Sequence, residues 1–183
     1  MDHYVDVTIR SDADVGVNQM MGTLFYKLHV WLSENMPNRV GLCFPKMALT
    51  PGDCLRLHGT ETDLKAVIGG NWRYSLLMFI QMQPVRPIPA NVQFCTVQRV
   101  QRKSVHNRRL RSIRKGWLNE TEVVSRIPGD HDRRLDLPFI VVRSHSSQQV
   151  IKIFIRQQVR FEPVEGGFTS YGLSKDGSTV PWF

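Results

Sequence analysis

Long hydrophobic runs are missing from this sequence of 183 residues. The longest uninterrupted apolar stretch is the five residues 76–80, whereas a helix that crosses a bilayer needs about 20. The N-terminal residues also lack a basic segment followed by a long apolar one, so no secretory signal is expected. These absences argue against a membrane protein and predict a cytoplasmic one.

Cysteine is also scarce. The three cysteines, Cys43, Cys54 and Cys95, are odd in number, and no two are at C-x-x-C spacing. A disulfide framework and a zinc site are therefore not expected, and three reduced cysteines in a core is the simpler interpretation. The six histidines include no pair at i, i+4, and neither a P-loop nor G-x-G-x-x-G is present. The sequence predicts no metal and no cofactor.

Acidic residues are absent from a long central stretch, between Asp63 and Glu120. The chain has a net charge of +8. The first 94 residues carry eight residues of each sign, so the whole excess lies in residues 95–183. A solvated helix face normally mixes both signs. The basic stretch therefore predicts an anionic polymer as the partner, with nucleic acid the first candidate.

The hydrophobic pattern of the first 90 residues predicts alternating strands and helices. Period-two alternation predicts a strand over residues 4–10, and an apolar arc of about 120° predicts a helix over residues 17–35. Two strands (40–44 and 54–58), a short helix (61–68) and an ambiguous apolar segment (76–83) follow. This order is the ferredoxin-like βαββαβ plan, which RNA-binding domains often use. Prolines 84, 87 and 89 predict a linker after it.

Residues 91–183 predict a second α+β domain, which binds RNA. An alternating strand (92–102) leads to a basic helix (104–115) and to a second helix that starts at Asn119 with a capping box. Strands over residues 139–142 and 150–156 follow, and a glycine-rich C-terminal segment is expected to pack against them. The predicted fold class is therefore α+β, with domains over residues 1–90 and 91–183.

The basic helix has two different sides. Four like charges share an arc of about 120°: Arg108, Arg111, Arg114 and Lys115. Apolar side chains lie opposite, with Arg109 between the two sides: Leu110, Ile113 and Trp117. We expect the apolar side to pack on the protein and the charged side to bind phosphates, with strongly salt-dependent affinity. A helix merely kept soluble by arginine is the alternative.

Other residues are weaker candidates when taken alone. His29 lies at the edge of the apolar face of the first helix, where a half-buried histidine bonded to a carbonyl is commoner than a catalyst. Arg99 and Gln101 would share a strand face and suit the edges of guanine and adenine. Residues 143–147 cluster hydroxyls after a strand, which also fits a polar turn.

Several segments, in order along nearly the whole chain, together resemble one known family. The most specific are the helix that carries His29 and the C-terminal tail. The matching segments include Met1-Asp-His-Tyr4, Leu24-Phe-x-Lys27-Leu-His29, Arg99-Val-Gln101, Leu135-Asp-Leu-Pro-Phe139, Arg143-Ser-x-Ser146, Glu165-Gly-Gly-Phe-x-x-Tyr171-Gly-Leu-Ser-Lys175 and Val180-Pro-Trp-Phe183. The chain resembles the CRISPR-associated endoribonucleases of subtype I-F, which process precursor CRISPR RNA.

The resemblance implies a substrate and a reaction. Such an enzyme cuts the hairpin of the CRISPR repeat at the 3′ base of its stem. The adjacent ribose 2′-OH is the nucleophile, so the product is a 2′,3′-cyclic phosphate and no metal is needed. The enzyme then keeps the mature crRNA and becomes a subunit of a crRNA-guided surveillance complex. The free protein is expected to be a monomer.

The resemblance also assigns roles to residues. His29 matches the catalytic histidine, Ser144 the serine that positions the attacking nucleotide, and Tyr171 the tyrosine that orients the histidine. Arg99 and Gln101 match side chains that read purines at the stem base. The remaining implied RNA contacts are Arg102, Lys103, Arg108, Arg109, Arg111, Arg114, Lys115, Ser146, Ser147 and Ile151. Whether His29 acts as base, as acid or as both stays open.

The chain departs from the family pattern at two positions. Ile151 stands where the family has an aromatic residue on the terminal base pair, which removes part of a stacking energy of about 1–3 kcal/mol. Lys115 replaces an arginine and weakens a bidentate contact. His145 is a second histidine near the site, although strand alternation points it away. Two other functions stay open: a catalytically silent subunit that caps the hairpin, and a generic binder of double-stranded nucleic acid.

Overall fold

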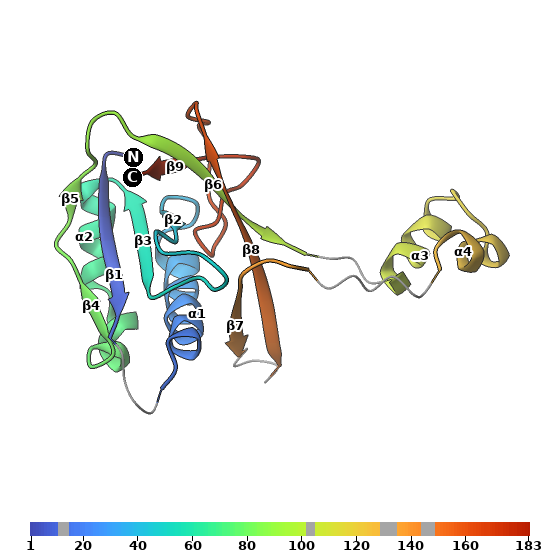
Figure 1. The fold of residues 1–183 in the computed structure, drawn as a ribbon, viewed down its shortest axis with the longest axis horizontal. Coiled ribbons are helices and arrows are strands. Elements are labelled where there is room, and N and C mark those ends of the chain that lie inside the picture. The colour runs from blue at the N-terminus through green and yellow to red at the C-terminus, as the bar shows by residue number, and fades with distance from the viewer. Residues whose placement is uncertain (11–14, 102–104, 129–134, 144–148) are drawn as a thin grey trace. The chain divides into compact units, whose positions relative to one another are not determined.

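The structure is a computed structural model that describes residues 1–10, 15–101, 105–128, 135–143 and 149–183 (Figure 1). By internal contacts the chain divides into two compact units. The first combines residues 1–100 with 137–183, and the second is residues 101–136. Six residues singled out from the sequence lie outside the described residues: Arg102, Lys103, Ser144, His145, Ser146 and Ser147.

The first unit begins with the predicted βαββαβ segment. Its elements are β1 (His3–Ile9), α1 (Val17–Asn35), β2 (Gly41–Cys43), β3 (Cys54–Gly59), α2 (Glu61–Gly69), the 3-10 helix η1 (Asn71–Leu76) and β4 (Ile80–Met82). The sheet has the order β2-β3-β1-β4 with all neighbours antiparallel, which is the ferredoxin-like arrangement. The ambiguous segment 76–83 resolves into the end of η1 and the edge strand β4.

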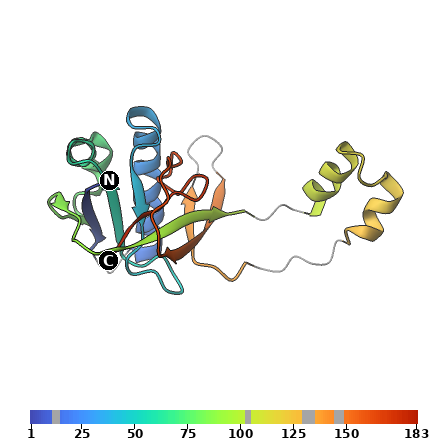
Figure 2. The same cartoon turned by 90° about the horizontal axis from the view of Figure 1, so that it is seen from above.

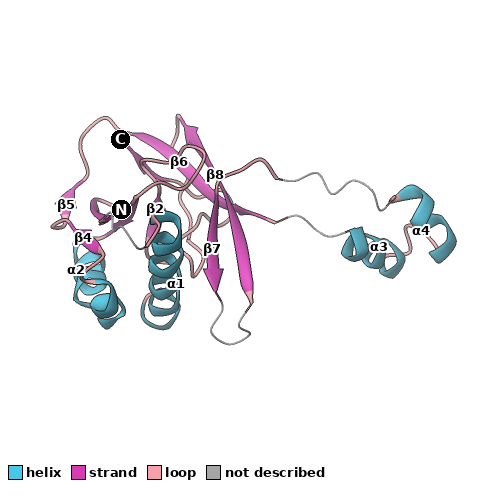
Figure 3. Cartoon of the chain, turned by 60° about the horizontal axis from the view of Figure 1, so that its bottom comes forward, coloured by secondary structure: helices cyan, strands magenta, loops and turns pink. Residues whose placement is uncertain are grey.

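Alternate residues of the central strands β1 and β3 are apolar and form one buried face of the sheet. Val5 and Val7 of β1 lie directly opposite Leu57 and Leu55 of β3, and all four are buried. Helices α1 and α2 cover this face of the sheet (Figure 3). Thr60 begins α2 because its hydroxyl accepts a hydrogen bond from the Asp63 amide at 3.2 Å.

The opposite face of β3 is buried as well, and a polar cluster covers it. Arg56 donates to both carboxylate oxygens of Asp6, at 2.7 and 2.9 Å, and to the carbonyl of Phe183 at 2.8 Å. Its guanidinium lies 4.1 Å from the Phe183 ring centroid. The C-terminal residue of the chain is thereby fixed on the first sheet.

Two uncharged side chains, those of Cys43 and His58, lie beside this cluster. The Cys43 Sγ atom is 3.3 Å from Nε2 of His58, and both residues are fully buried. Burial lowers the pKa of His58 to about 3 and raises the pKa of the Cys43 thiol. All three cysteines are buried and free, as the sequence predicted.

The proline-rich segment forms part of the sheet, so the prediction of a linker was wrong. β5 (Arg86–Pro87) pairs with β1 at His3 and Tyr4, and the amide of Ile88 donates to Asp2 at 2.9 Å. Proline fits an edge strand because the amide hydrogen that it lacks is not required for a hydrogen bond on the open side of such a strand. The predicted domain boundary at residue 90 falls inside the first compact unit, since later strands share its core.

Those later strands form a second antiparallel sheet in the order β7-β8-β6-β9. They are β6 (Gln93–Val100), β7 (Phe139–Arg143), β8 (Val150–Arg160) and β9 (Val180–Trp182). Helix α1 lies between the first sheet and β7 (Figures 1 and 2). At this crossing a Cβ on Gly22 would lie 1.9 Å from the carbonyl oxygen of Val141, so only glycine allows the approach.

The glycine-rich C-terminal segment packs against the second sheet, as predicted. The amide of Ser174 donates to the Val97 carbonyl at 2.7 Å, and the Val97 amide donates to the Ser174 hydroxyl at 2.9 Å. Phe168 and Leu173 are buried in the common core. These contacts hold residues 168–174 in a fixed turn.

The second unit contains the two predicted helices, α3 (Val105–Arg114) and α4 (Glu120–Arg126). Asn119 forms the predicted capping box, because its side chain accepts from the Glu122 amide at 2.7 Å while Glu122 accepts from the Asn119 amide at 3.4 Å. The α+β fold class predicted from the sequence is confirmed by both units together.

Candidate active site and nucleic-acid interface

The rings of His29 and Tyr171 lie face to face. His29 is half-buried on α1, and Tyr171 comes from the C-terminal segment. Their centroids are 3.7 Å apart and their planes differ by 7°. Tyr171 also stacks on Phe25, at 5.2 Å and 18°. Since Phe25 and His29 are one helical turn apart, the tyrosine ring contacts two successive turns of α1.

A tight turn fixes Tyr171 in this position. Gly172 has a φ of +71°, which favours glycine, and an added Cβ would approach Leu42 to 2.9 Å. The Gly172 amide donates to Thr169 at 2.8 Å, and the Gly172 carbonyl accepts from the Leu42 amide at 2.9 Å. The turn is therefore bonded to β2 of the first sheet, which limits movement of the tyrosine.

The two nitrogens of the His29 ring differ. Nδ1 is buried and has no hydrogen-bond partner among the residues that the structure describes. A buried polar atom without a partner costs free energy of folding. Nε2 is not such an atom. An imidazole nitrogen can accept or donate one proton, and the stack on Tyr171 holds the ring in place.

The end of β6 carries the second candidate group. Arg99 lies opposite Ile155 of β8 and is half-buried, and its Nε is enclosed without a partner among the described residues. β6 ends at Val100, so the strand alternation that we used to pair Arg99 with Gln101 does not reach Gln101, which is exposed. Ile151 lies further along this sheet, opposite Val142, and is 36% exposed.

Helix α3 presents its charges to solvent. Arg108, Arg111 and Arg114 are exposed on the helix, and Lys115 is exposed directly after it. Arg109 is half-buried, and its Nε donates to the carbonyl of Ile127 at 2.9 Å. Arg109 thus fastens α3 to the end of α4, so its side chain is at least partly structural.

The predicted apolar side of α3 was wrong in part. Leu110 is 52% exposed and Trp117 is 63% exposed, and Ser112 is the buried residue of the helix. The wheel assumed that the apolar side must pack against a larger body, whereas this small unit supplies little surface to cover it. The ammonium of Lys115 lies 4.9 Å from the Trp117 ring centroid.

The described residues contain neither a membrane-spanning helix nor a cluster of metal ligands. No helix there is long and apolar enough to cross a membrane. No group of three or more histidine, cysteine or acidic side chains there has an arrangement that could hold a metal ion.

Fold and site together define a ferredoxin-like α+β protein in which a histidine is stacked on a tyrosine and an arginine-rich helix is exposed. A family model described as "CRISPR-associated protein (Cas_Csy4)" matches residues 4–183. The chain is 41% identical over 185 residues to a protein of Escherichia coli (strain UTI89 / UPEC), and 40% identical over 190 residues to one of Pseudomonas aeruginosa (strain UCBPP-PA14). Both are named CRISPR-associated endonuclease Cas6/Csy4, and each comparison covers 100% of both chains.

This chain therefore belongs to the Cas_Csy4 family of CRISPR-associated proteins. The family resemblance inferred from the sequence is confirmed. Phe25 is the main site residue that the sequence analysis did not single out. Its place in the apolar stripe of α1 indicates only a core residue, and its contact with Tyr171 depends on a segment almost 150 positions away.

Proposed function

We propose that this protein is an endoribonuclease that cleaves precursor CRISPR RNA at the 3′ base of the repeat hairpin. The names of the relatives and the family match support an endonuclease that acts in a CRISPR system. The observation that carries the proposal is the stack of His29 on Tyr171, with centroids 3.7 Å apart. The stack holds an imidazole in a defined place on α1, which suits proton transfer.

In the proposed reaction the ribose 2′-OH attacks the adjacent phosphorus. The 2′-OH loses its proton, the phosphorus–O5′ bond breaks, and the departing O5′ takes up a proton. A 2′,3′-cyclic phosphate and a 5′-hydroxyl result, without oxidation or reduction and without a metal. His29 serves at least one of the two proton transfers, and Tyr171 is a positioning residue. Ser144 places the attacking nucleotide, while Ser146 and Ser147 line the scissile phosphate.

RNA binding is assigned to a second set of residues. Arg99 and Gln101 read purines at the base of the stem, with Arg102 and Lys103 beside them, and Ile151 covers the terminal base pair. The cations of α3 bind stem phosphates, which supplies salt-dependent affinity. Since no acidic residue occurs from position 64 to 119, nothing in that stretch opposes the phosphates. The enzyme then keeps its product and acts in the cytoplasm as a subunit of a surveillance complex.

The test is cleavage of an end-labelled repeat RNA in EDTA by wild type and by His29→Ala. Wild type should make one cut at the stem base, and a 2′-deoxy nucleotide before the cut should abolish it. The variant should be slower by about 10²–10⁴-fold, which is the usual contribution of general acid–base catalysis, with unchanged hairpin affinity.

Three results would contradict the proposal: cutting by His29→Ala at the wild-type rate, dependence on added metal, or cutting of the 2′-deoxy RNA. Tight hairpin binding without any cut by wild type would support the alternative, a silent capping subunit. Ile151 would then be the first residue to replace by an aromatic one.

A further inference from the structure

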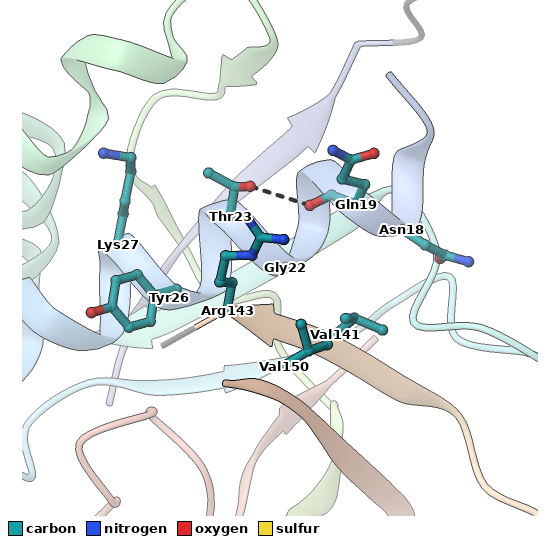
Figure 4. Close-up of a pocket in the computed structure, with 9 residues that line it drawn as sticks. All are labelled: Asn18, Gln19, Gly22, Thr23, Tyr26, Lys27, Val141, Arg143 and Val150. Carbon is teal, nitrogen blue, oxygen red and sulfur yellow. Dashed lines mark hydrogen bonds between the residues drawn. The ribbon is translucent and has the colours of Figure 1, made fainter. Parts of the chain in front are cut away.

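An open groove runs beside α1, between this helix and the strands β7 and β8 (Figure 4). Its volume is about 570 Å³. Gly22 and Val141 form its floor, where helix and strand are in closest contact. The groove belongs entirely to the first unit, and the sequence analysis assigned nothing to it.

The polar residues of the groove suit a polyanion. Lys27 and Arg143 line it, and none of the described residues that line it is acidic. Arg143 is exposed, Lys27 is half-exposed, and neither has a carboxylate at ion-pair distance in the described part of the chain. Asn18 and Gln19 add uncharged amides at the other end of the groove. Unpaired cations in a concave site attract anions, and amides can bond phosphate or base edges.

The floor of the groove lies two helical turns from the candidate catalytic ring. Gly22 and His29 are seven residues apart, so they share a face of α1 and lie about 10 Å apart along it. Tyr26, between them, lines the groove, and its ring centroid is 6.5 Å from that of His29. An RNA strand that passes His29 along this face of α1 would therefore enter the groove.

The groove lies away from Arg99, although Ile151, another proposed stem contact, is next to Val150 at the edge of the groove. Arg99 is opposite Ile155 of β8, whereas Arg143 is opposite Val150. Five residues of an extended strand separate these positions by roughly 16 Å. The two arginines can therefore hold different parts of one RNA.

We propose that this groove binds the RNA segment that follows the scissile phosphate, with Lys27 and Arg143 on its phosphates. The inference rests on the proposed function, which puts the hairpin at Arg99 and the cut at His29. Binding on both sides of the cut holds the phosphate between two fixed points, and release of the downstream strand leaves the hairpin product bound.

The test uses two repeat hairpins with a 2′-deoxy nucleotide before the cut, so that neither is cleaved. One ends a single nucleotide after the scissile phosphate, and the other continues for several nucleotides. Wild type should bind the longer RNA roughly fivefold or more tightly, with a steeper salt dependence. The double variant Lys27→Gln/Arg143→Gln should bind both RNAs equally, and the shorter one as wild type does. Arg86→Gln, on β5, should keep the wild-type difference.

Equal affinity of wild type for the two RNAs would overturn the inference. So would a double variant that loses the same factor for both RNAs, because its cations would then contact the hairpin itself. Thermal unfolding of each variant verifies that it is folded. Failure of the proposed function appears separately, as absence of cutting when wild type meets the all-ribose RNA.

Discussion

At the scale of single residues, the site depends on a contact between two aromatic rings. A stacked aromatic pair contributes about 0.5–1.5 kcal/mol beyond its buried area, which favours the stacked orientation of the His29 ring. Phe25 also stacks on Tyr171, with ring centroids 5.2 Å apart. The tyrosine ring thus stacks on two rings of α1, and its hydroxyl is not needed for either contact.

We therefore predict different results for two replacements of Tyr171. Tyr171→Phe keeps the ring and should cut at nearly the wild-type rate. Tyr171→Ala frees the imidazole and should lower the single-turnover rate by roughly 10- to 100-fold, because small errors in position are costly in catalysis. Hairpin affinity should change little in both variants. Equal loss in both variants would instead assign the effect to the hydroxyl.

The sequence could not reveal this stack on physical grounds. His29 lies at the edge of an apolar stripe, where its position alone favours an ordinary half-buried histidine. The partner ring is brought to it by the Gly172 turn, whose bond to Leu42 is a tertiary contact. Only the resemblance to a family linked His29 with Tyr171, because no local pattern relates residues so far apart.

At the scale of elements, the crossing of α1 and β7 determines where the site lies. The helix approaches the strand so closely that the Gly22 position has no room for a Cβ. One helix is thereby shared between the first sheet and the second. His29, two turns further along, and the groove beside Gly22 both depend on this approach.

We predict that Gly22→Ala lowers the free energy of unfolding by about 2 kcal/mol or more, in the upper range for overpacked sites. Gly69→Ala is the matched control, because Gly69 ends α2 and has no atom within 4 Å of an added Cβ. It should be neutral or stabilising by up to about 1 kcal/mol. Urea unfolding measures both. Wild-type stability of Gly22→Ala would mean that helix and strand separate without cost.

Elements with a strong local pattern were predicted well from the sequence. The bounds of α1 agree because its apolar period is sustained over five turns, and the Asn119 capping box fixes the start of α4. β5 was missed because two residues, one of them proline, are too few to show the period-two pattern of a strand. Their pairing with β1 is a tertiary contact that the local sequence does not show. Leu110 and Trp117 were misjudged because a helical wheel shows which side is apolar but not what covers it.

At the scale of the whole molecule, buried neutral groups make stability depend on pH. His58 has a pKa of about 3 in the folded chain because burial disfavours its charge, and an ordinary value near 6.5 when unfolded. Between these values the unfolded chain binds more protons, so folding stability falls as pH falls from about 6.5 toward 3.

We predict that wild type loses about 2 kcal/mol more stability between pH 7 and pH 5 than His58→Gln does. The variant lacks the titrating ring, although it begins less stable because a buried side chain is changed. His106→Gln, at an exposed position on α3, should keep the wild-type pH dependence. Urea unfolding at the two pH values provides the comparison, and parallel curves for wild type and His58→Gln would refute it.

The two points where the chain leaves and re-enters the second sheet make residues 101–136 an insertion that could be exchanged as one piece. Residues 101–136 depart from β6 and return to β7, and both strands flank β8. Two strand spacings put the exits about 10 Å apart, so an excursion between them carries little closure entropy. Its sequence can drift without shifting the register of the sheet. On the proposed function, exchanging residues 101–136 should change which RNA is bound, while the first unit and its His29 site keep their structure.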